Sequence, residues 1–349
     1  METTADTPEA LDARLEEIGA GSWRTQALYV AARLNLADLL AGGPRTSEEL
    51  AREAGGDGGG AHAPSLRRLL RALTTLEIVR ERDDGSFELL PLGALLRSDV
   101  PGSRRAWALM VGGMQWQTWG HLLESVRTGR SARSLLQGTE GFEHLERDPE
   151  QAAVFNQAMV DLTRRVAPAV LRAYDFSSCG RIVDVGGGYG ELLSAILAAH
   201  AGARGVLFDL EHAIEGGRRL LETAGVADRC EFLVGSFFES IPAGADAYVL
   251  KSIVHDWNDE RAGVLLSACR RATPPGAKLL LVERVMPERL GASATDQVVA
   301  RSDLNMLVSL GARERTEAEF ASLLASAGFR LTRVVPATLG FHVVEAVPA

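Results

Sequence analysis

The spacing of apolar residues changes character about halfway along the chain. One stripe at helical spacing lies near the N-terminus and consists of Ala27, Val30, Ala31 and Leu34. After Ser177, short β-branched and aliphatic runs alternate with helical segments instead. This alternation predicts an α/β fold with a mostly parallel, doubly wound sheet, whose ligands bind at the carboxyl ends of the strands.

Seven segments of the second half have the composition of strands. In chain order they read RIVDV, GVLFDL, CEFLVG, DAYVLKSI, AKLLLVERV, RLTRVV and FHVVEAV. A helical stretch precedes them, and one side of it is formed by Phe155, Met159, Leu162 and Val166. The pattern therefore predicts a helical middle followed by a seven-stranded sheet.

The first hundred residues predict helices followed by a β-hairpin. Thr46 and Glu49 have the spacing of a capping box, which starts a short helix. A later helix places four leucines on one face: Leu66, Leu69, Leu70 and Leu73. The segment EIVRERDDGSFELL then alternates around a turn at Asp84 and Gly85. Helices followed by such a hairpin make a winged-helix unit.

A winged helix either reads DNA or serves as a dimerisation platform. Arg67, Arg68 and Arg71 lie on the helix that would enter a DNA groove, but arginines at this spacing more commonly form a solvated face. The formal net charge is −9, whereas DNA-binding proteins usually carry a basic face. We therefore favour dimerisation and expect no nucleic-acid partner.

Composition adds expectations about compartment and redox state. No apolar run is long enough to span a bilayer, and the polar N-terminus does not resemble a signal peptide, so we expect a cytoplasmic protein without a membrane partner. Cys179, Cys230 and Cys269 are scattered and odd in number, which favours reduced thiols over disulfides or a metal site. The single low-complexity stretch is GGDGGG, at residues 55–60.

The first predicted strand runs into a glycine loop, DVGGGYG. Its glycines, Gly186, Gly188 and Gly190, do not follow the GxGxxG spacing of dinucleotide-binding loops. Asp184 precedes the loop, and Asp209 ends the next strand, where an acid commonly binds ribose hydroxyls. Asp184 would repel a pyrophosphate but suits an ammonium and a sulfonium. The pattern therefore favours S-adenosylmethionine over NAD or FAD, and a tight turn in an unrelated α/β fold is the alternative.

The fourth predicted strand ends in a polar cluster within KSIVHDWND. The cluster consists of Lys251, His255, Asp256 and Trp257, and Asn258 can cap the helix that follows. An isolated His-Asp pair more commonly belongs to an ordinary loop. The carboxyl end of a central strand is where α/β active sites lie, and this position favours a functional histidine.

From about residue 20 to its end, the chain resembles the S-adenosylmethionine-dependent small-molecule O-methyltransferases. This family includes plant caffeate and flavonoid enzymes and bacterial enzymes that tailor aromatic antibiotics. The match covers the winged helix and then, in the family's order, FNQAM, DVGGGYG, FDLEH, KSIVHDWND, LLVERV, DLNML and GARERTEAEF. The resemblance implies a winged-helix dimerisation domain at 1–105, a helical linker that contributes to the substrate pocket at 106–175 and a Rossmann-like catalytic domain at 176–349.

The resemblance also implies roles for individual residues. His255 would be the general base, and Glu283 and Glu314 would orient it and stabilise the imidazolium. Residues expected at the cofactor are Asp184, Gly186, Gly188, Asp209, Ser236, Phe237, Lys251 and Trp257. Residues expected at the acceptor are Met159, Asn305 and Met306. Ser236 departs from the family, which usually has an acid there, so it supplies a hydroxyl but no negative charge near the adenine.

The implied reaction transfers a methyl group from S-adenosylmethionine to a phenolic hydroxyl of an aromatic natural product, without a metal. A homodimer formed through the N-terminal domain is expected. Two alternatives remain. One is a winged-helix regulator that senses a ligand. The other is a relative of the same fold that carries out decarboxylation or hydroxylation, but such relatives tend to lack the base histidine, which is present here as His255.

Overall fold

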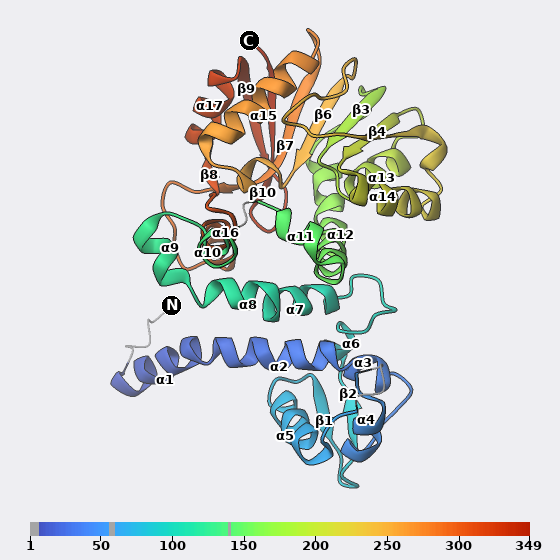
Figure 1. Ribbon diagram of the computed structural model, residues 1–349, viewed down its shortest axis with the longest axis vertical. Coiled ribbons are helices and arrows are strands. Elements are labelled where there is room, and N and C mark those ends of the chain that lie inside the picture. The colour runs from blue at the N-terminus through green and yellow to red at the C-terminus, as the bar shows by residue number, and fades with distance from the viewer. Residues whose placement is uncertain (1–6, 56–59, 139–140) are drawn as a thin grey trace. The chain divides into compact units, whose positions relative to one another are not determined.

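The chain divides into two compact units, Met1–Trp116 and Gln117–Ala349 (Figure 1). The computed structural model describes residues 7–55, 60–138 and 141–349. Residues 56–59 of the GGDGGG stretch therefore lie outside the described residues. The three-part division with boundaries after residues 105 and 175 stays a prediction.

The first unit consists of helices and one hairpin, as its hydrophobic pattern predicts. The helices are α1 (Pro8–Gly19), α2 (Gly21–Arg33), α3 (Leu36–Leu39), α4 (Ser47–Glu53), α5 (Ala63–Thr74), α6 (Pro91–Ala94) and α7 (Arg105–Gly112). The strands β1 (Val79–Glu81) and β2 (Phe87–Leu89) pair in antiparallel fashion around the Gly85 turn. Thr46 and Glu49 form the predicted capping box at the start of α4.

The core of the first unit lies between α5 and the hairpin. Leu66, Leu70 and Leu73 of the predicted leucine face are buried, and Phe87 of β2 is fully buried as well. Leu69 is half-buried. The amphipathic pattern of α5 therefore fixes which side of this helix faces the wing.

The second unit begins with helices that precede the sheet. In chain order these are α8 (Met114–Trp119), which starts in the first unit, α9 (Leu122–Thr128), α10 (Ala132–Gln137), α11 (Glu143–Arg147) and the long α12 (Pro149–Ala173). Asp148 starts α12, because its side chain accepts a hydrogen bond from the backbone N–H of Gln151. In Figure 1, α9 to α12 and α16 (Ala294–Leu310) gather below the sheet.

All seven predicted strands are present in one sheet, in the order β5-β4-β3-β6-β7-β10-β9. They are β3 (Arg181–Val185), β4 (Arg204–Asp209), β5 (Cys230–Val234), β6 (Ala247–Lys251), β7 (Lys278–Met286), β9 (Phe329–Pro336) and β10 (Phe341–Pro348). Neighbours are parallel except that β10 runs antiparallel to both β7 and β9. A two-residue strand, β8 (Arg315–Thr316), pairs with the end of β7 and was too short to predict.

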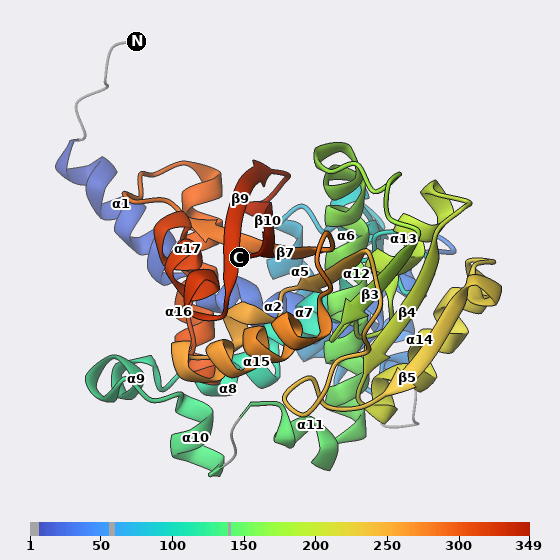
Figure 2. The ribbon, with the colours of Figure 1, turned by 90° about the horizontal axis from the view of Figure 1, so that it is seen from above.

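Helices cover both faces of the sheet (Figure 2). One face packs against α12, α13 (Glu191–Ala199) and α14 (Glu211–Thr223), and the other packs against α15 (Asp259–Ala272) and α17 (Glu317–Ser326). Two short 3-10 turns, η1 (Ala227–Arg229) and η2 (Val254–Asp256), complete the unit. The chain order reverses at β3, which lies between β4 and β6, and such a reversal opens a ligand crevice at the strand ends.

Within the described residues, none of the helices combines the length and the apolar character needed to cross a membrane.

Candidate active site

The turn after β6 carries His255 and has an unusual backbone. Ser252 has φ +55°, a left-handed conformation that residues other than glycine rarely adopt. Such conformations cost about 1–3 kcal/mol and concentrate at functional sites. Glu283 on β7 holds the turn, since its Oε1 accepts the backbone N–H groups of Ile253 and Val254 at 2.9 and 2.7 Å. The buried carboxylate therefore fixes the backbone that leads to the histidine.

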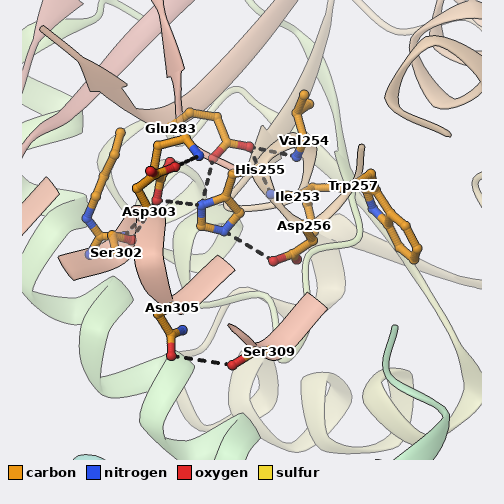
Figure 3. Close-up of polar contacts among 12 residues, drawn as sticks. Ile253, Val254, His255, Asp256, Trp257, Glu283, Ser302, Asp303, Asn305 and Ser309 are labelled. Atoms are coloured by element: carbon orange, nitrogen blue, oxygen red, sulfur yellow. Dashed lines mark hydrogen bonds and ion pairs between the residues drawn. The ribbon is translucent and has the colours of Figure 1, made fainter. Parts of the chain in front are cut away.

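The His255 ring lies among three carboxylates (Figure 3). The ring is 5% exposed. Its Nδ1 lies 3.0 Å from Oε1 of Glu314 and 3.6 Å from Oε2 of Glu283. Its Nε2 lies 3.4 Å from Oδ1 of Asp256. Because an ionised carboxylate can only accept, Nδ1 is the donor to Glu314, and this contact sets the ring's orientation.

Glu314 is delivered by the segment that follows α16. Gly311, with φ +67°, ends the helix and lets the chain turn back. Ser302 Oγ donates to Oε1 of Glu314 at 2.6 Å, and Asp303 Oδ1 accepts the Glu314 backbone N–H at 2.9 Å. Residues of α16 therefore position the second carboxylate beside His255.

Arg315 also holds the turn that carries His255, through hydrogen bonds to its backbone. The sequence analysis did not identify this residue. The side chain is fully buried. It donates to the carbonyl oxygens of Val254 at 3.0 Å and Trp257 at 2.8 Å, which flank His255 in the chain. Two further donations reach Oδ1 of Asp259, at 3.0 and 2.8 Å. The only signal in the sequence was a basic residue directly after Glu314.

The carboxylates change the protonation of the cluster. Burial opposes a charged imidazole, but Glu314, Glu283 and Asp256 outweigh it and raise the pKa of His255 to about 10. Burial raises the pKa of Asp256 to about 7 although His255 opposes this. Burial also raises the pKa of Glu283, whereas for Glu314 the charge and hydrogen bond of His255 outweigh burial and lower it. The protein by itself therefore favours an imidazolium at neutral pH.

The same three residues have a spacing that a metal ion could use, because ligand atoms of His255, Glu283 and Glu314 lie within 4.8 Å of one another. Hydrogen bonds already engage Oε1 of both glutamates. A proton shared between Nδ1 of His255 and Oε1 of Glu314 accounts for their 3.0 Å contact without a metal ion. The expectation of a metal-free site stays a prediction.

The glycine loop is tied to the end of β4 by Asp209. Its Oδ2 accepts the backbone N–H of Gly188 at 2.7 Å, and its Oδ1 accepts that of Leu210 at 2.6 Å. A Cβ at Gly188 would meet nothing within 4 Å, so this glycine faces open space. A Cβ at Gly186 would lie 2.7 Å from the side chain of Ile253, so packing requires that glycine.

Asp184 is a buried carboxylate without a hydrogen-bond partner. Neither of its oxygens has one among the described residues. Burial and the charge of Asp209 raise the pKa of Asp184 to about 7. An unpaired buried acid beside an open glycine loop fits a ligand that brings a cationic group. The residues present therefore fit the ammonium group and ribose of S-adenosylmethionine.

Aromatic side chains line the other end of the expected cofactor site. The ring centroids of Phe237 and Phe238 lie 6.2 and 4.8 Å from that of Trp257. The guanidinium of Arg261 lies 4.8 Å from the Trp257 ring. Ser236 Oγ accepts the backbone N–H of Phe238 at 3.3 Å, so the hydroxyl supports a local turn. The Trp257 Nε1 is buried without a partner among the described residues.

Lys251 lies at the end of β6, near the same crevice. Burial, together with the charge of Arg284, lowers the pKa of this lysine to about 8, although Glu283, Asp184 and Asp256 oppose the shift. Its Nζ lies 5.8 Å from the centroid of the Phe341 ring. Lys251 is therefore a partly neutralised cation between the carboxylates of the glycine loop and those around His255.

The residues expected at the acceptor come from α12 and α16. Oδ1 of Asn305 accepts hydrogen bonds from Trp119 Nε1 at 3.0 Å and from Ser309 Oγ at 3.4 Å. Asn305 lies one turn after Ser302 on α16, so this amide shares a helix with the serine that donates to Glu314 (Figure 3). Met306 is buried on the same helix, and Met159 is half-buried on α12. Trp119 was missed because nothing near it in the sequence marks a site.

Both parts of the chain match known protein families. Residues 119–330 match the O-methyltransferase domain, and residues 17–99 match the O-methyltransferase dimerisation domain. The phenazine O-methyltransferase PhzM of Lysobacter antibioticus is 44% identical over 339 residues, covering 97% of this chain and 96% of that protein. The crystal structure of LaPhzM has a TM-score of 0.92 at 44% identity and covers 97% of this chain and 99% of its own.

More distant relatives show which ligands and reactions occur on this fold. The O-methyltransferase NcsB1 from neocarzinostatin biosynthesis, in complex with S-adenosylmethionine and 2-hydroxy-5-methyl naphthoic acid, has a TM-score of 0.82 at 34% identity, with 96% of this chain and 98% of that chain covered. Aclacinomycin 10-hydroxylase RdmB of Streptomyces purpurascens is 35% identical over 329 residues, 93% of this chain and 86% of that protein. The domain matches and the identity to named methyltransferases show that the chain belongs to the S-adenosylmethionine-dependent O-methyltransferases.

Proposed function

We propose that the enzyme methylates a phenolic hydroxyl of an aromatic natural product and that His255 is its general base. The observation that carries this proposal is the buried imidazole whose Nδ1 lies 3.0 Å from Glu314. S-adenosylmethionine, when bound, supplies an electrophilic methyl group on its sulfonium. Relatives named for phenazine methylation and complexed with a naphthoic acid support an aromatic acceptor.

The chain's own residues would hold the cofactor by charge and shape. Asp184 offers an unpaired carboxylate to the ammonium group. Asp209, at the end of β4, is placed for the ribose hydroxyls, and the open side of Gly188 leaves room beside it. Phe237 and Trp257 provide ring surfaces for the adenine.

The carboxylates around His255 bring the pKa of its ring close to that of a phenol. A phenol has a pKa of about 10 and an ordinary histidine of about 6.5, so proton transfer would cost roughly 5 kcal/mol. Against the effect of burial, Glu314, Glu283 and Asp256 raise the pKa of His255 to about 10, so proton transfer from a phenol to the neutral ring costs little. A second part of the barrier is orientation, which a rigid ring held by two glutamates supplies.

At neutral pH the same charges keep a proton on Nε2. That proton must leave before Nε2 can accept one from the acceptor. Asp256 lies 3.4 Å from Nε2, and because its pKa of about 7 is below that of His255 it stabilises the proton on Nε2, which must therefore leave to solvent as the ligands bind. Because like charges repel, a cation bound in the same cleft makes His255 release its proton more readily. His255 then accepts the proton of the acceptor hydroxyl at Nε2.

The proposal includes a homodimer formed through the N-terminal unit. The match to a dimerisation domain at residues 17–99 supports it. Large apolar side chains on α1 and α2 are exposed, namely Leu11, Leu15, Ile18 and Trp23. An exposed stripe of this kind is typical of a protein interface. Sedimentation velocity checks the assembly, and a monomer at every concentration would exclude it.

Replacement of His255 by Ala tests the catalytic role. Single-turnover transfer of labelled methyl to a panel of phenols at neutral pH should slow about a hundredfold to ten-thousandfold. His121→Ala, a histidine whose side chain is 45% exposed, serves as the matched control. A His255→Ala rate within a few-fold of the unmodified enzyme would remove the general base from the proposal.

Hydroxylation is the second candidate, because RdmB is named a hydroxylase and shares 35% identity with the chain. The intact arrangement of His255 with Glu283 and Glu314 supports methyl transfer instead. The same labelled assay separates the two reactions. Labelled product supports transfer, whereas oxygen uptake or release of carbon dioxide without labelled product supports the alternative.

A further inference from the structure

Arg133 on α10 is a buried cation that has no acidic partner among the described residues. Its residue is 5% exposed. Among the described residues no carboxylate pairs with it, and its one hydrogen bond runs from Nε to the carbonyl oxygen of Ser309 at 3.3 Å. Burial lowers the pKa of Arg133 to about 10, so the guanidinium still carries its charge at neutral pH. Buried charges of this kind are normally paired.

The other buried arginine of the unit shows what a structural role looks like. Arg315 has its charge paired with Asp259 and donates to two carbonyl oxygens. Arg133 uses only Nε, on a carbonyl in the last turn of α16, where basic side chains commonly act as caps. Capping therefore accounts for one of its donors, and within the described residues the four N–H groups of the terminal nitrogens have no hydrogen-bond partner.

A second buried polar group feels the charge of this guanidinium. His144, on α11, has a buried Nδ1 with no hydrogen-bond partner among the described residues. Burial and the positive charge of Arg133 lower the pKa of His144 to about 4, so its ring is neutral at pH 7. The neutral imidazole can donate or accept according to its tautomer. Among the described residues, both groups thus have hydrogen-bonding capacity left for a ligand.

Contacts place these groups beside the expected acceptor site. Ser309, which accepts from Arg133, also donates to Asn305. Phe142, two residues before His144, packs its ring 6.4 Å from that of Trp257, in the turn that carries His255. Figure 1 shows α10 beside α16 and α11 beside α12.

The separation from the catalytic cluster suits a fused aromatic ligand. Ser302, which donates to Glu314, and Ser309 lie about two turns apart on α16, or about 10 Å along its axis. Figure 3 shows Ser309 on the part of α16 that leads away from His255. A ligand with its hydroxyl at His255 therefore presents its far end toward Arg133.

We propose that Arg133, assisted by His144, binds a carboxylate on the far end of the aromatic acceptor. The preferred substrates would then be hydroxylated polycyclic arenes that carry a carboxylate. A guanidinium matches a carboxylate through two parallel hydrogen bonds, and the ligand would supply a counter-ion that the described residues do not provide. This inference rests on the proposed function for its hydroxyl, but the carboxylate site is tested without turnover.

Calorimetric titration of the full chain with 1-naphthoate and with 1-naphthamide, in the presence of S-adenosylhomocysteine, tests the site directly. The two probes have nearly the same shape and no hydroxyl, so only the charge differs. The acid should bind about tenfold more tightly or better, as a hydrogen-bonded charge pair predicts. Equal affinities, or binding of neither probe, would overturn the proposal.

Two variants of Arg133 separate a role in binding the carboxylate from a role in capping the end of α16. In Arg133→Gln the amide nitrogen occupies the same place along the side chain as Nε, so the bond to Ser309 can persist while the charge is lost. Arg133→Met removes both. We expect each variant to lose the preference for naphthoate, and Arg133→Met also to unfold at a lower temperature. Arg130→Gln, an exposed arginine three residues away, should keep the preference. An undiminished preference in Arg133→Gln would show that Arg133 only caps α16.

Steady-state kinetics with two kinds of acceptor distinguish failure of this inference from failure of the proposed function. A set of hydroxynaphthoic acids and their carboxamides serves as acceptors. The ratio of kcat/KM for acid over amide should be about tenfold or more and fall toward one in Arg133→Gln. Equal methylation of acid and amide would refute the carboxylate site and keep the methyltransferase. Methylation of neither, with Arg133-dependent naphthoate binding intact, would keep the site and refute the phenolic acceptor.

Discussion

Two groups of buried carboxylates lie in the second unit, and they differ in how fully they are paired. Glu345 on β10 accepts from Tyr174 at 2.6 Å, Thr332 at 2.7 Å and Arg333 at 3.1 Å, and Lys278 lies 3.4 Å away. Burial alone would raise the pKa of Glu345, but the hydrogen bonds outweigh it and lower it to about 2. This carboxylate is satisfied by the fold itself.

The carboxylates of the cleft are not satisfied. Both oxygens of Asp184 and Oε2 of Glu283 and of Glu314 have no hydrogen-bond partner among the described residues. Burial raises the pKa of Asp184 and of Asp256 to about 7. The comparison shows that burial alone does not mark a functional acid. Unused hydrogen-bonding capacity distinguishes this second group, and for Asp184 and Glu283 it comes with a raised pKa.

Removal of the Glu283 side chain should have the largest effect within this comparison. Glu283→Ala leaves the N–H groups of Ile253 and Val254 unpaired, which costs about 1–3 kcal/mol for each, and it releases the histidine turn. We expect methyl transfer to slow about a hundredfold or more. Glu283→Gln can still accept both bonds and should keep its thermal stability. Nearly normal single-turnover rates in the Ala variant would contradict the bracing role.

Replacement of Glu314 by Gln should shift the pH dependence. Among the effects on His255, the charge of Glu314 is the largest that opposes burial and raises the pKa. Its loss lowers the pKa of His255, so the acid limb of kcat/KM should move to lower pH by about one to three units. The maximal rate should fall, because the ring is less well oriented. A profile measured from about pH 5 to 11 that stays in place would contradict this coupling.

Glu345→Gln should affect stability but not methyl transfer. Because the folded state lowers the pKa of Glu345 from 4.5 to about 2, its contribution is present above about pH 4.5 and is lost as the pH falls through 2. We expect the free energy of unfolding at pH 7 to fall by about 1–3 kcal/mol. The difference from the unmodified protein should shrink in acid. Urea unfolding at several pH values checks this, and a large loss of kcat would place Glu345 in the wrong group.

The surface charges of the first unit should give the smallest effect. Arg67 and Arg71 lie 3.1 and 3.5 Å from Glu81, and Arg82 lies 3.4 Å from Glu88. Exposed pairs contribute little, so Arg67→Ala should change stability by about 0.5 kcal/mol or less. Arg67 and Arg71, two of the three arginines that a DNA-binding winged helix would offer to phosphates, thus face an acid. Salt-sensitive binding of duplex DNA that Arg67→Ala abolishes would revive the regulator hypothesis.

The sequence predicted the elements wherever a local pattern specifies them. Thr46 with Glu49 marked the start of α4, and the turn at Gly85 marked the hairpin. Asp184 and Asp209 could be expected at one edge of the sheet, because they end or nearly end neighbouring parallel strands. Local patterns succeed here because hydrogen bonds and burial within one element depend on residues close in the chain.

Interactions between distant segments could not be read in this way. Trp119 reaches Asn305 across 186 positions of the chain, and the sequence around it carries no motif. Arg133 lies on a short helix, where one arginine is ordinary until its burial and the lack of an acidic partner among the described residues are known. Such contacts depend on how helices pack around the sheet, which no local spacing encodes.

By itself, the sequence determined the α/β alternation, the glycine loop and the residue types of the proposed catalytic set. Only the tertiary structure decided that His255 meets Glu314, 59 residues away, and that Arg315 holds the turn between them. The physical reason is that the order of strands brings the ends of β6 and β7 and the segment after α16 to one edge of the sheet. At that edge the side chains are buried close together, so that each shifts the pKa values of the others.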